Sequence, residues 1–414
     1  MKKILALILA TLMLASVAVV FGSCGEKDDG FKLGVILLHD EKSTYDKNFL
    51  EAVEKAAEAL GLEDDQVILK KNVPESNACY DAAADLVDQG CDVIFADSFG
   101  HESFMLKAAK EFPEVEFCHA TGTMAHTENL DNFHNAFASI YEGRYLAGVA
   151  AGLKLKAMME ADSTVVPKIG YVGAFTYAEV ISGYTSYYLG VKSIVPEVTM
   201  EVQFTGSWYD EVEEKNAALA LINNGCVLIS QHADSMGAPS ACEENNVPNV
   251  SYNGSTLTSC PNTFIVSSKI DWTPYFKLIC EKTMNGEKIP ADWTGTIGTG
   301  SVALTDVNGN AAAEGTQAKL DAVKAELVAG TRKVFDTSTF TVTVVTEGDN
   351  KKNVNATVDA NGVLTAYMAD VDTDKAFTGD TNVISDGCFN ESKFRSAPYF
   401  DIQIDGITLL NAKF

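Results

Sequence analysis

The stretches Asp85-Leu-Val-Asp-Gln-Gly-Cys-Asp-Val-Ile-Phe-Ala-Asp97 and Ala220-Leu-Ile-Asn-Asn-Gly-Cys-Val-Leu-Ile-Ser-Gln-His232 repeat one pattern in two distant parts of the chain. In each, a helical segment runs into a glycine, Gly90 or Gly225, the residue expected in the left-handed position after a helix. A short apolar strand follows at once and ends in polar residues. The repetition predicts two similar units whose sheets carry polar groups at the carboxyl ends of their strands.

The same alternation of short apolar runs and longer amphipathic runs extends along most of the chain. The predicted strands are 31–38, 66–70, 92–96 and 115–119, then 168–172, 200–204, 227–231 and 249–252. The predicted helices are 48–60, 79–89 and 102–111, then 179–193, 211–224 and 238–246. This order predicts an α/β fold with two doubly wound parallel sheets. From about residue 337 the alternation stops, and 339–346 and 354–360 are typical of antiparallel strands.

One long segment, 142–159 (EGRYLAGVAAGLKLKAMM), is predicted to form a helix rich in small residues. Its composition suits close packing against another element. Arg144, Lys154 and Lys156 argue against a membrane span.

Composition limits the partners of the protein. The chain has 414 residues, a length typical of two domains or one two-lobed unit. Its 57 acidic residues against 31 basic ones give a formal net charge of −26. A surface this acidic repels phosphate groups, so we predict no nucleic-acid partner and disfavour polyanionic substrates.

The N-terminus has the layout of a secretory signal. Lys2 and Lys3 precede an uncharged, mostly apolar run, which ends in Phe21-Gly22-Ser23-Cys24. Small residues directly before a cysteine resemble a lipobox, in which Cys24 is acylated and becomes the new N-terminus. Residues 1–23 would then be removed, and 24–30 would form a polar tether. The alternative is an ordinary signal peptide or an uncleaved anchor.

Catalytic motifs are missing from the sequence. It contains no Walker loop, no GxGxxG after a strand, no GxSxG turn and no HExxH. His119 and His126 have no cysteine or carboxylate partner at a telling spacing, so we predict neither a metal site nor catalytic residues. The eight cysteines after Cys24 form no CxxC pair. We expect buried thiols, although disulfides would be permitted outside the cytoplasm.

Aromatic and polar side chains are predicted to meet where strands end. A flat ligand needs aromatic faces, and the candidates are Tyr45, Tyr184, Tyr187 and Trp208. The polar edge of such a ligand needs donors and acceptors, and the candidates are Asp46, Asp97, Asp210, Asp234 and Asn253. Each has the alternative of a solvated loop residue or a helix cap. Asp210 in particular would cap the helix 211–224.

Several segments together carry a family resemblance. They are 40–49 (DEKSTYDKNF), 118–122 (CHATG), 142–152 (EGRYLAGVAAG), 168–173 (KIGYVG), 206–210 (GSWYD) and 231–234 (QHAD). They resemble the basic membrane protein family of substrate-binding lipoproteins for ABC importers, whose well-known members bind purine nucleosides. The resemblance covers roughly residues 31–336. It implies a type I periplasmic-binding-protein fold, in which three crossovers join two lobes at a hinge.

The resemblance also implies domain boundaries. Lobe 1 would comprise 31–138 and about 267–298, and lobe 2 would comprise 139–266 and about 299–336. Residues 337–414 depart from the family pattern and would form a β-rich C-terminal extension.

Some positions of this chain match the family's binding-site motifs closely, and others depart from them. The resemblance implies that Tyr45 and Trp208 stack on the ligand from opposite lobes. Asp46 stands where the family usually has asparagine, so a donor is lost and an acceptor remains. His232 and Asp234 match a branch with the pattern Gln-His-Thr-Asp, which accepts purine bases. The family's Ser-x-x-Lys near the hinge is matched only loosely, by 267–269.

We therefore expect a lipid-anchored, outward-facing receptor at the cell membrane that captures a purine nucleoside or nucleobase. It would deliver this ligand to an ABC permease and ATPase complex, with no cofactor and no chemical reaction. Two alternatives remain. One is a ligand sensor with the same fold. The other is an extracytoplasmic nucleoside hydrolase, which would need a metal-binding acidic cluster or an activated nucleophile.

Replacing Cys24 with serine tests the lipid anchor. Serine has no thiol to acylate, and stable anchoring needs two acyl chains. In fractionated cells labelled with a fatty acid, the Cys24→Ser protein should move to the soluble fraction or stay uncleaved and unlabelled. Unchanged acyl labelling would contradict this anchor site.

Overall fold

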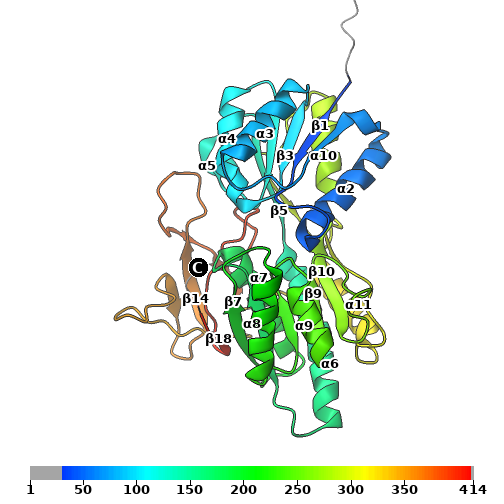
Figure 1. Cartoon of the computed structure of the whole chain (residues 1–414). Coiled ribbons are helices and arrows are strands. Elements are labelled where there is room, and N and C mark those ends of the chain that lie inside the picture. The colour runs from blue at the N-terminus through cyan, green and yellow to red at the C-terminus, as the bar shows by residue number, and fades with distance from the viewer. Residues whose placement is uncertain (1–29, 412–414) are drawn as a thin grey trace, which may run out of the picture.

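The computed structural model describes residues 30–411, which form two α/β lobes and a C-terminal extension (Figure 1). Cys24 lies outside the described residues. Lobe 1 contains a six-stranded sheet in the order β11-β5-β4-β3-β1-β2, with every pairing parallel. The strands are β1 (Leu33–Ile36), β2 (Val67–Lys70), β3 (Val93–Ala96), β4 (Glu116–Ala120), β5 (Phe133–Ala138) and β11 (Asp292–Gly295). The helices are α2 (Thr44–Leu60), α3 (Asn77–Asp88), α4 (Glu102–Glu111), α5 (Met124–Glu128) and α10 (Thr273–Met284).

Lobe 2 contains a seven-stranded sheet in the order β12-β10-β9-β8-β6-β7-β18, which is parallel except for β12. The strands are β6 (Lys168–Gly173), β7 (Thr199–Phe204), β8 (Ile229–Gln231), β9 (Asn249–Tyr252), β10 (Phe264–Ile270), β12 (Val302–Leu304) and β18 (Ile407–Leu409). The helices are α6 (Ile140–Ala161), α7 (Ala178–Lys192), α8 (Glu211–Asn223), α9 (Gly237–Asn245) and α11 (Thr316–Val328).

This architecture confirms the predicted fold class of two parallel-sheet lobes. One boundary differs from the prediction. The chain returns to lobe 1 after Ile270 rather than after about Val266, because β10 stays paired with β9 in the sheet of lobe 2. The eight cysteines of the described residues are all buried and free, as expected for small apolar side chains.

The two repeated stretches end their helices in the same way. Gly90 and Gly225 have positive φ angles of 80° and 89°. The Gly90 N–H donates to the Val87 carbonyl at 2.9 Å, and the Cys91 N–H donates to the Leu86 carbonyl at 3.1 Å. The second stretch repeats both bonds at the end of α8. This Schellman arrangement turns each chain directly from its helix into the next strand.

Helices α6 and α7 pack so closely that only glycine fits at their contact. A Cβ atom on Gly148 would lie 2.1 Å from the Tyr187 carbonyl oxygen, and one on Gly190 would lie 2.2 Å from the Tyr145 carbonyl oxygen. The small residues of the predicted long helix therefore serve helix packing, as expected from its composition.

The C-terminal extension lies along lobe 2 and reaches up to lobe 1 (Figure 1, orange to red). It contains a three-stranded antiparallel sheet of β13 (Ala356–Val358), β14 (Leu364–Ala369) and β15 (Thr381–Asn382), and a pair of β16 (Ile384–Ser385) and β17 (Cys388–Phe389). Its last strand, β18, pairs in parallel with β7.

One strand prediction in the extension is wrong. Residues 339–346 form only an isolated bridge between Val345 and Lys352. Thr and Val in alternation favour a strand, but within residues 30–411 no strand pairs with this segment. Scattered backbone and side-chain hydrogen bonds to Gly362 and Asp405 replace a ladder. The predicted strand 354–360 is shortened to β13.

Replacing Gly148 with alanine should destabilise lobe 2. The new methyl group would collide with backbone that cannot move aside without separating α6 from α7. We expect a loss of roughly 1–3 kcal/mol in the free energy of unfolding, measured by denaturant titration. Gly309→Ala is the control, because nothing lies within 4 Å of its added Cβ. Equal stability of the two variants would contradict this packing.

Candidate ligand-binding site

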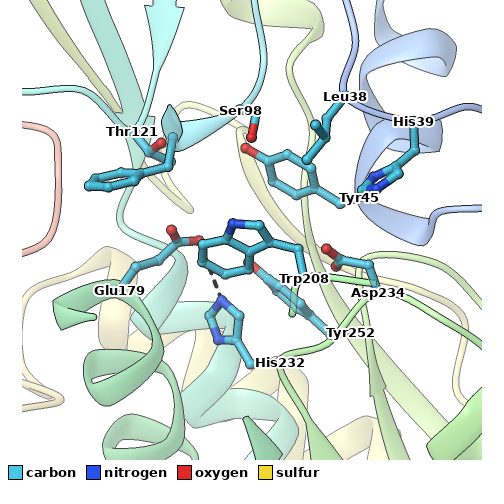
Figure 2. Close-up of a pocket in the computed structure, with 11 residues that line it drawn as sticks. Leu38, His39, Tyr45, Ser98, Thr121, Glu179, Trp208, His232, Asp234 and Tyr252 are labelled. Carbon is cyan, nitrogen blue, oxygen red and sulfur yellow. Dashed lines mark hydrogen bonds and ion pairs between the residues drawn. The ribbon is translucent and has the colours of Figure 1, made fainter. Parts of the chain in front are cut away.

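A pocket lies between the lobes, at the carboxyl ends of their strands (Figure 2). Its empty space, including solvent at the open mouth, is about 380 Å³. Lobe 1 supplies Leu38, His39, Tyr45, Ser98, Phe99 and Thr121, and lobe 2 supplies Glu179, Trp208, His232, Asp234 and Tyr252. Because parallel strands end at one edge of a sheet, loops distant in sequence reach one cavity.

Two aromatic rings enter this pocket from opposite lobes (Figure 2). Tyr45 lies in the first turn of α2, and its hydroxyl donates to the Asp97 carbonyl at 2.8 Å. Trp208 lies in the loop between β7 and α8 and meets the ring of Phe175 edge-on at a centroid distance of 5.0 Å. Both side chains are half-buried, so a flat ligand between the lobes would contact an aromatic ring from each side.

Asp46 and Asp97 lie behind the pocket rather than in its wall. Both are fully buried. Asp46 Oδ1 accepts the His39 N–H at 2.7 Å, and Asp97 Oδ1 accepts the Leu38 N–H at 3.0 Å. These two carboxyl groups therefore hold the loop between β1 and α2, which carries pocket residues.

The two carboxyl groups have opposite pKa shifts. Burial raises the pKa of Asp97 well above its usual value, and the nearby charge of Asp46 adds to the rise. Burial also opposes ionisation of Asp46, but hydrogen bonds from His39 and Ser43 outweigh it and lower its pKa. We therefore assign a charged Asp46 beside a neutral Asp97, so the family's asparagine is replaced by a charged acceptor.

Polar groups of lobe 2 also hold the lobes together. The Asp234 carbonyl accepts from the Thr44 N–H at 3.1 Å and from the Thr44 hydroxyl at 3.2 Å. Asn48 Nδ2 donates to Asn253 Oδ1 at 3.1 Å. Asn253 in turn donates to Asp234 Oδ1 at 3.4 Å. Asn253 thus joins the lobes beside the pocket and does not line it.

Three sequence candidates lie elsewhere, namely Asp210 and the two buried tyrosines of α7, Tyr184 and Tyr187. Asp210 caps α8, accepting the N–H groups of Val212 and Glu213 at 3.1 and 3.0 Å. This is the capping alternative considered from the sequence. Tyr187 lies in the middle of α7 rather than near its start, is fully buried, and packs against Tyr171 at 5.8 Å. It belongs to the core because α7 begins about ten residues before it and turns this side chain inward.

The sequence analysis missed several residues of the pocket, namely Leu38, His39, Ser98, Phe99, Thr121, Glu179 and Tyr252. Thr121 follows β4 directly, and Ser98 follows Asp97 at the end of β3, so the rule that selected Asp97 points to both residues. Glu179 carries no such signal, because it lies within the first turn of α7 rather than directly after a strand.

His232 is held neutral by its surroundings. Its Nε2 lies 3.3 Å from Glu179 Oε1, and its ring packs against Tyr252 at 4.7 Å. The Arg144 guanidinium lies 3.4 Å from the centre of the Tyr252 ring and donates to the Gln231 carbonyl at 2.9 Å. Burial, and then the charge of Arg144, lower the pKa of His232 to about 4. In a neutral imidazole one ring nitrogen is a donor and the other an acceptor, and in His232 Nε2 faces Glu179.

Comparison with known proteins agrees with this geometry. The family described as ABC transporter substrate-binding protein, PnrA-like, matches residues 34–334. The chain belongs to this PnrA-like family. It is 30% identical to a purine-binding protein of Brucella abortus, over 67% of this chain and 77% of that protein.

Two further relatives differ in their named ligands. A putative ABC transporter glucose-binding protein of Haloferax volcanii is 33% identical over 54% of each chain. A nucleoside-binding protein of Lactococcus lactis is 25% identical over 57% of this chain and 66% of that protein.

The fold is also similar to that of a solved protein. A solved ABC transporter solute-binding protein from Conexibacter woesei superposes with a TM-score of 0.60 at 21% identity, covering 73% of this chain and 98% of that one. Among residues 30–411, no helix combines the length and the apolar character that a membrane crossing requires.

Acid should destabilise this protein partly through His232. Its pKa is about 4 when folded and near the ordinary value of about 6.5 when unfolded, so between these values the unfolded state binds more protons. The contribution of His232 to the free energy of unfolding is therefore fully present above pH 6.5 and is lost as the pH falls toward 4. The full difference is on the order of 3 kcal/mol for this group.

His232→Gln should make the acid loss of stability shallower in denaturant titrations at several pH values. It would not abolish the loss, because burial also lowers the pKa values of His101 and His119 to about 4. Parallel stability curves for the wild type and His232→Gln would contradict a neutral, buried His232.

Proposed function

We propose that this protein captures a purine nucleobase or purine nucleoside outside the cytoplasm and delivers it to an ABC permease and ATPase complex. The observation that carries the proposal is the pocket between the lobes, into which Tyr45 and Trp208 project from opposite sides. The match to an ABC substrate-binding family supports transport and an extracytoplasmic position. The Brucella and Lactococcus relatives, named for purine and nucleoside binding, support the ligand class.

The polar groups of the pocket suit the edge of a purine. Glu179 offers carboxylate oxygens that accept N–H donors. Burial raises the pKa of Asp234 well above its usual value, so Asp234 offers a neutral carboxyl group with a donor and an acceptor. Ring nitrogens and exocyclic groups of a purine present donors and acceptors in one plane. Aromatic contacts from both lobes would then hold the faces of the ring while these groups select its edge.

Binding would favour the closed arrangement of the lobes. The contacts of Thr44 with Asp234 and of Asn48 with Asn253 exist only while the lobes touch. A ligand that bridges Tyr45 and Trp208 adds contacts available only in the same arrangement. A ligand shifts an equilibrium only through such differential contacts. The closed form is then the form offered to the transporter, held at the membrane through acylated Cys24.

A nucleoside hydrolase remains the second candidate, and its requirements are specific. The Ser98 hydroxyl donates to Glu75 Oε1 at 2.6 Å and not to His232, so Ser98 and His232 do not form a nucleophile–histidine pair. Among residues 30–411, three acidic side chains come close enough to share a metal ion only at Asp372, Asp374 and Asp380, none of which lines the pocket. We therefore propose binding without turnover. A purine nucleoside incubated with the protein should be recovered intact by chromatography.

Trp208→Ala tests the stacking role. Loss of the indole should weaken binding of a purine nucleoside or base by roughly 30- to 1,000-fold, because about 2–4 kcal/mol of stacking and apolar contact is lost. The affinity is measured by calorimetric titration.

Trp293→Ala is the matched control for Trp208→Ala. Trp293 is also a half-buried tryptophan, but it packs on Tyr275 in lobe 1 and does not line the pocket. Its removal should lower the melting temperature and leave the affinity of the folded protein unchanged. If Trp208→Ala behaved in the same way, Trp208 would be a packing residue and the proposed site would be wrong.

A further inference from the structure

A second cavity adjoins the ligand pocket, and the C-terminal extension forms one of its walls. We call it the extension chamber. It holds about 840 Å³ measured out to its open mouth and shares Phe99, Thr121 and Glu179 with the ligand pocket. Its other lining residues are Thr123 from lobe 1, Thr176, Tyr177 and Ala178 from lobe 2, and Arg395, Ala397, Pro398 and Asp401 from the extension.

The wall formed by residues 395–401 is fastened to both lobes. On lobe 1, Ser396 donates through its N–H and hydroxyl to the two carboxylate oxygens of Asp292, at 2.6 and 2.5 Å. On the side of lobe 2, Phe400 is fully buried and stacks on Phe335 at 4.2 Å. A few residues later the chain enters the sheet of lobe 2 as β18. The wall is therefore part of the folded structure on both sides of the cleft.

A ring pair from the two lobes lines the extension chamber, and one of its members, Phe99, also lines the ligand pocket. Phe99 of lobe 1 and Tyr177 of lobe 2 approach to a centroid distance of 5.2 Å. Both side chains remain exposed, at 44% and 39%. Large aromatic rings left open at a cavity shared by both lobes are available to cover a ligand that extends from one space into the other.

The chamber mixes donors and acceptors. Arg395 uses Nε and one terminal nitrogen to bond the carbonyls of Ala397 and Asp370, at 3.3 and 2.9 Å, which fixes its guanidinium beside the cavity. Glu179 and Asp401 offer carboxylates, and three threonines offer hydroxyl groups. Neighbouring hydroxyl groups on a ligand can accept from arginine and donate to carboxylates at once. A phosphate group is disfavoured in the chamber, because it would lie near two carboxylates in a protein with a net charge of −26.

We propose that residues 395–401 are a third wall of the ligand site and that the extension chamber binds a hydroxyl-bearing, uncharged part of the ligand. This inference rests on the proposed function, in which the flat ring occupies the ligand pocket. For a purine nucleoside, the group in the chamber is the sugar. The wall is an addition to the family's binding site, because the family match ends at residue 334.

Paired ligands test the third wall. Calorimetric titrations would compare adenosine with adenine, and guanosine with guanine, on the full mature chain. Arg395→Ala should weaken nucleoside binding about 10-fold, and the near-isosteric Thr176→Val about fivefold. Both variants should bind the corresponding bases within about twofold of the wild type, because the base does not reach the chamber.

Lys393→Ala is the control. Lys393 is an exposed cation two residues from Arg395 and lines neither cavity, so its loss should change neither affinity. If both chamber variants bind nucleosides as the wild type does, or lose nucleoside and base affinity equally, the third wall is wrong. If the wild type itself binds no purine and no nucleoside, the proposed function fails instead. Melting curves identify a variant that fails to fold, and Thr176→Val then decides the result.

Discussion

Two parallel sheets buried on both faces constrain everything else in this protein. Helices cover the faces, so a ligand can reach the chain only at the edge where strands end. The carboxyl edges of the two sheets turn toward each other, and the loops after β1, β3, β4, β7 and β8 converge there. The pocket is a consequence of this arrangement, and its chemistry depends on the few residues that each loop contributes.

The same arrangement places charged and neutral forms of similar groups close together. Asp97 is held neutral by burial, while its neighbour Asp46 stays ionised through hydrogen bonds to the loop between β1 and α2. In lobe 2, His232 is neutral because burial and the nearby charge of Arg144 both lower its pKa. Low solvent access therefore decides which groups present donors and which present acceptors.

The contacts across the cleft include hydrogen bonds of Thr44 and Asn48 and the ring pair of Phe99 and Tyr177. A typical hydrogen bond adds only about 0.5–1.5 kcal/mol in net terms, so the contacts of Thr44 and Asn48 with lobe 2 hold the lobes together weakly. A weak balance between open and closed forms is what a ligand of moderate affinity can shift. The extension also joins the two lobes, since it is attached to lobe 2 by β18 and to lobe 1 through Ser396 and Asp292.

Local sequence determined the strands, the helices and the rule that places functional groups. Hydrophobic periodicity and the glycines at 90 and 225 act within about ten residues, so the sequence predicts the alternation of elements and the two-lobed fold class. The family resemblance adds the pocket positions of four residues, Tyr45, Trp208, His232 and Asp234. Tertiary structure alone decided which neighbouring candidates face the cleft. Asp210 turned to its own helix and Tyr187 into the core, because a side chain's direction depends on where its helix begins and what packs over it. The parallel pairing of β18 with β7, and the wall that precedes it, join residues about 200 positions apart. No local pattern encodes such a contact, because its stability comes from a partner strand that the sequence does not place nearby.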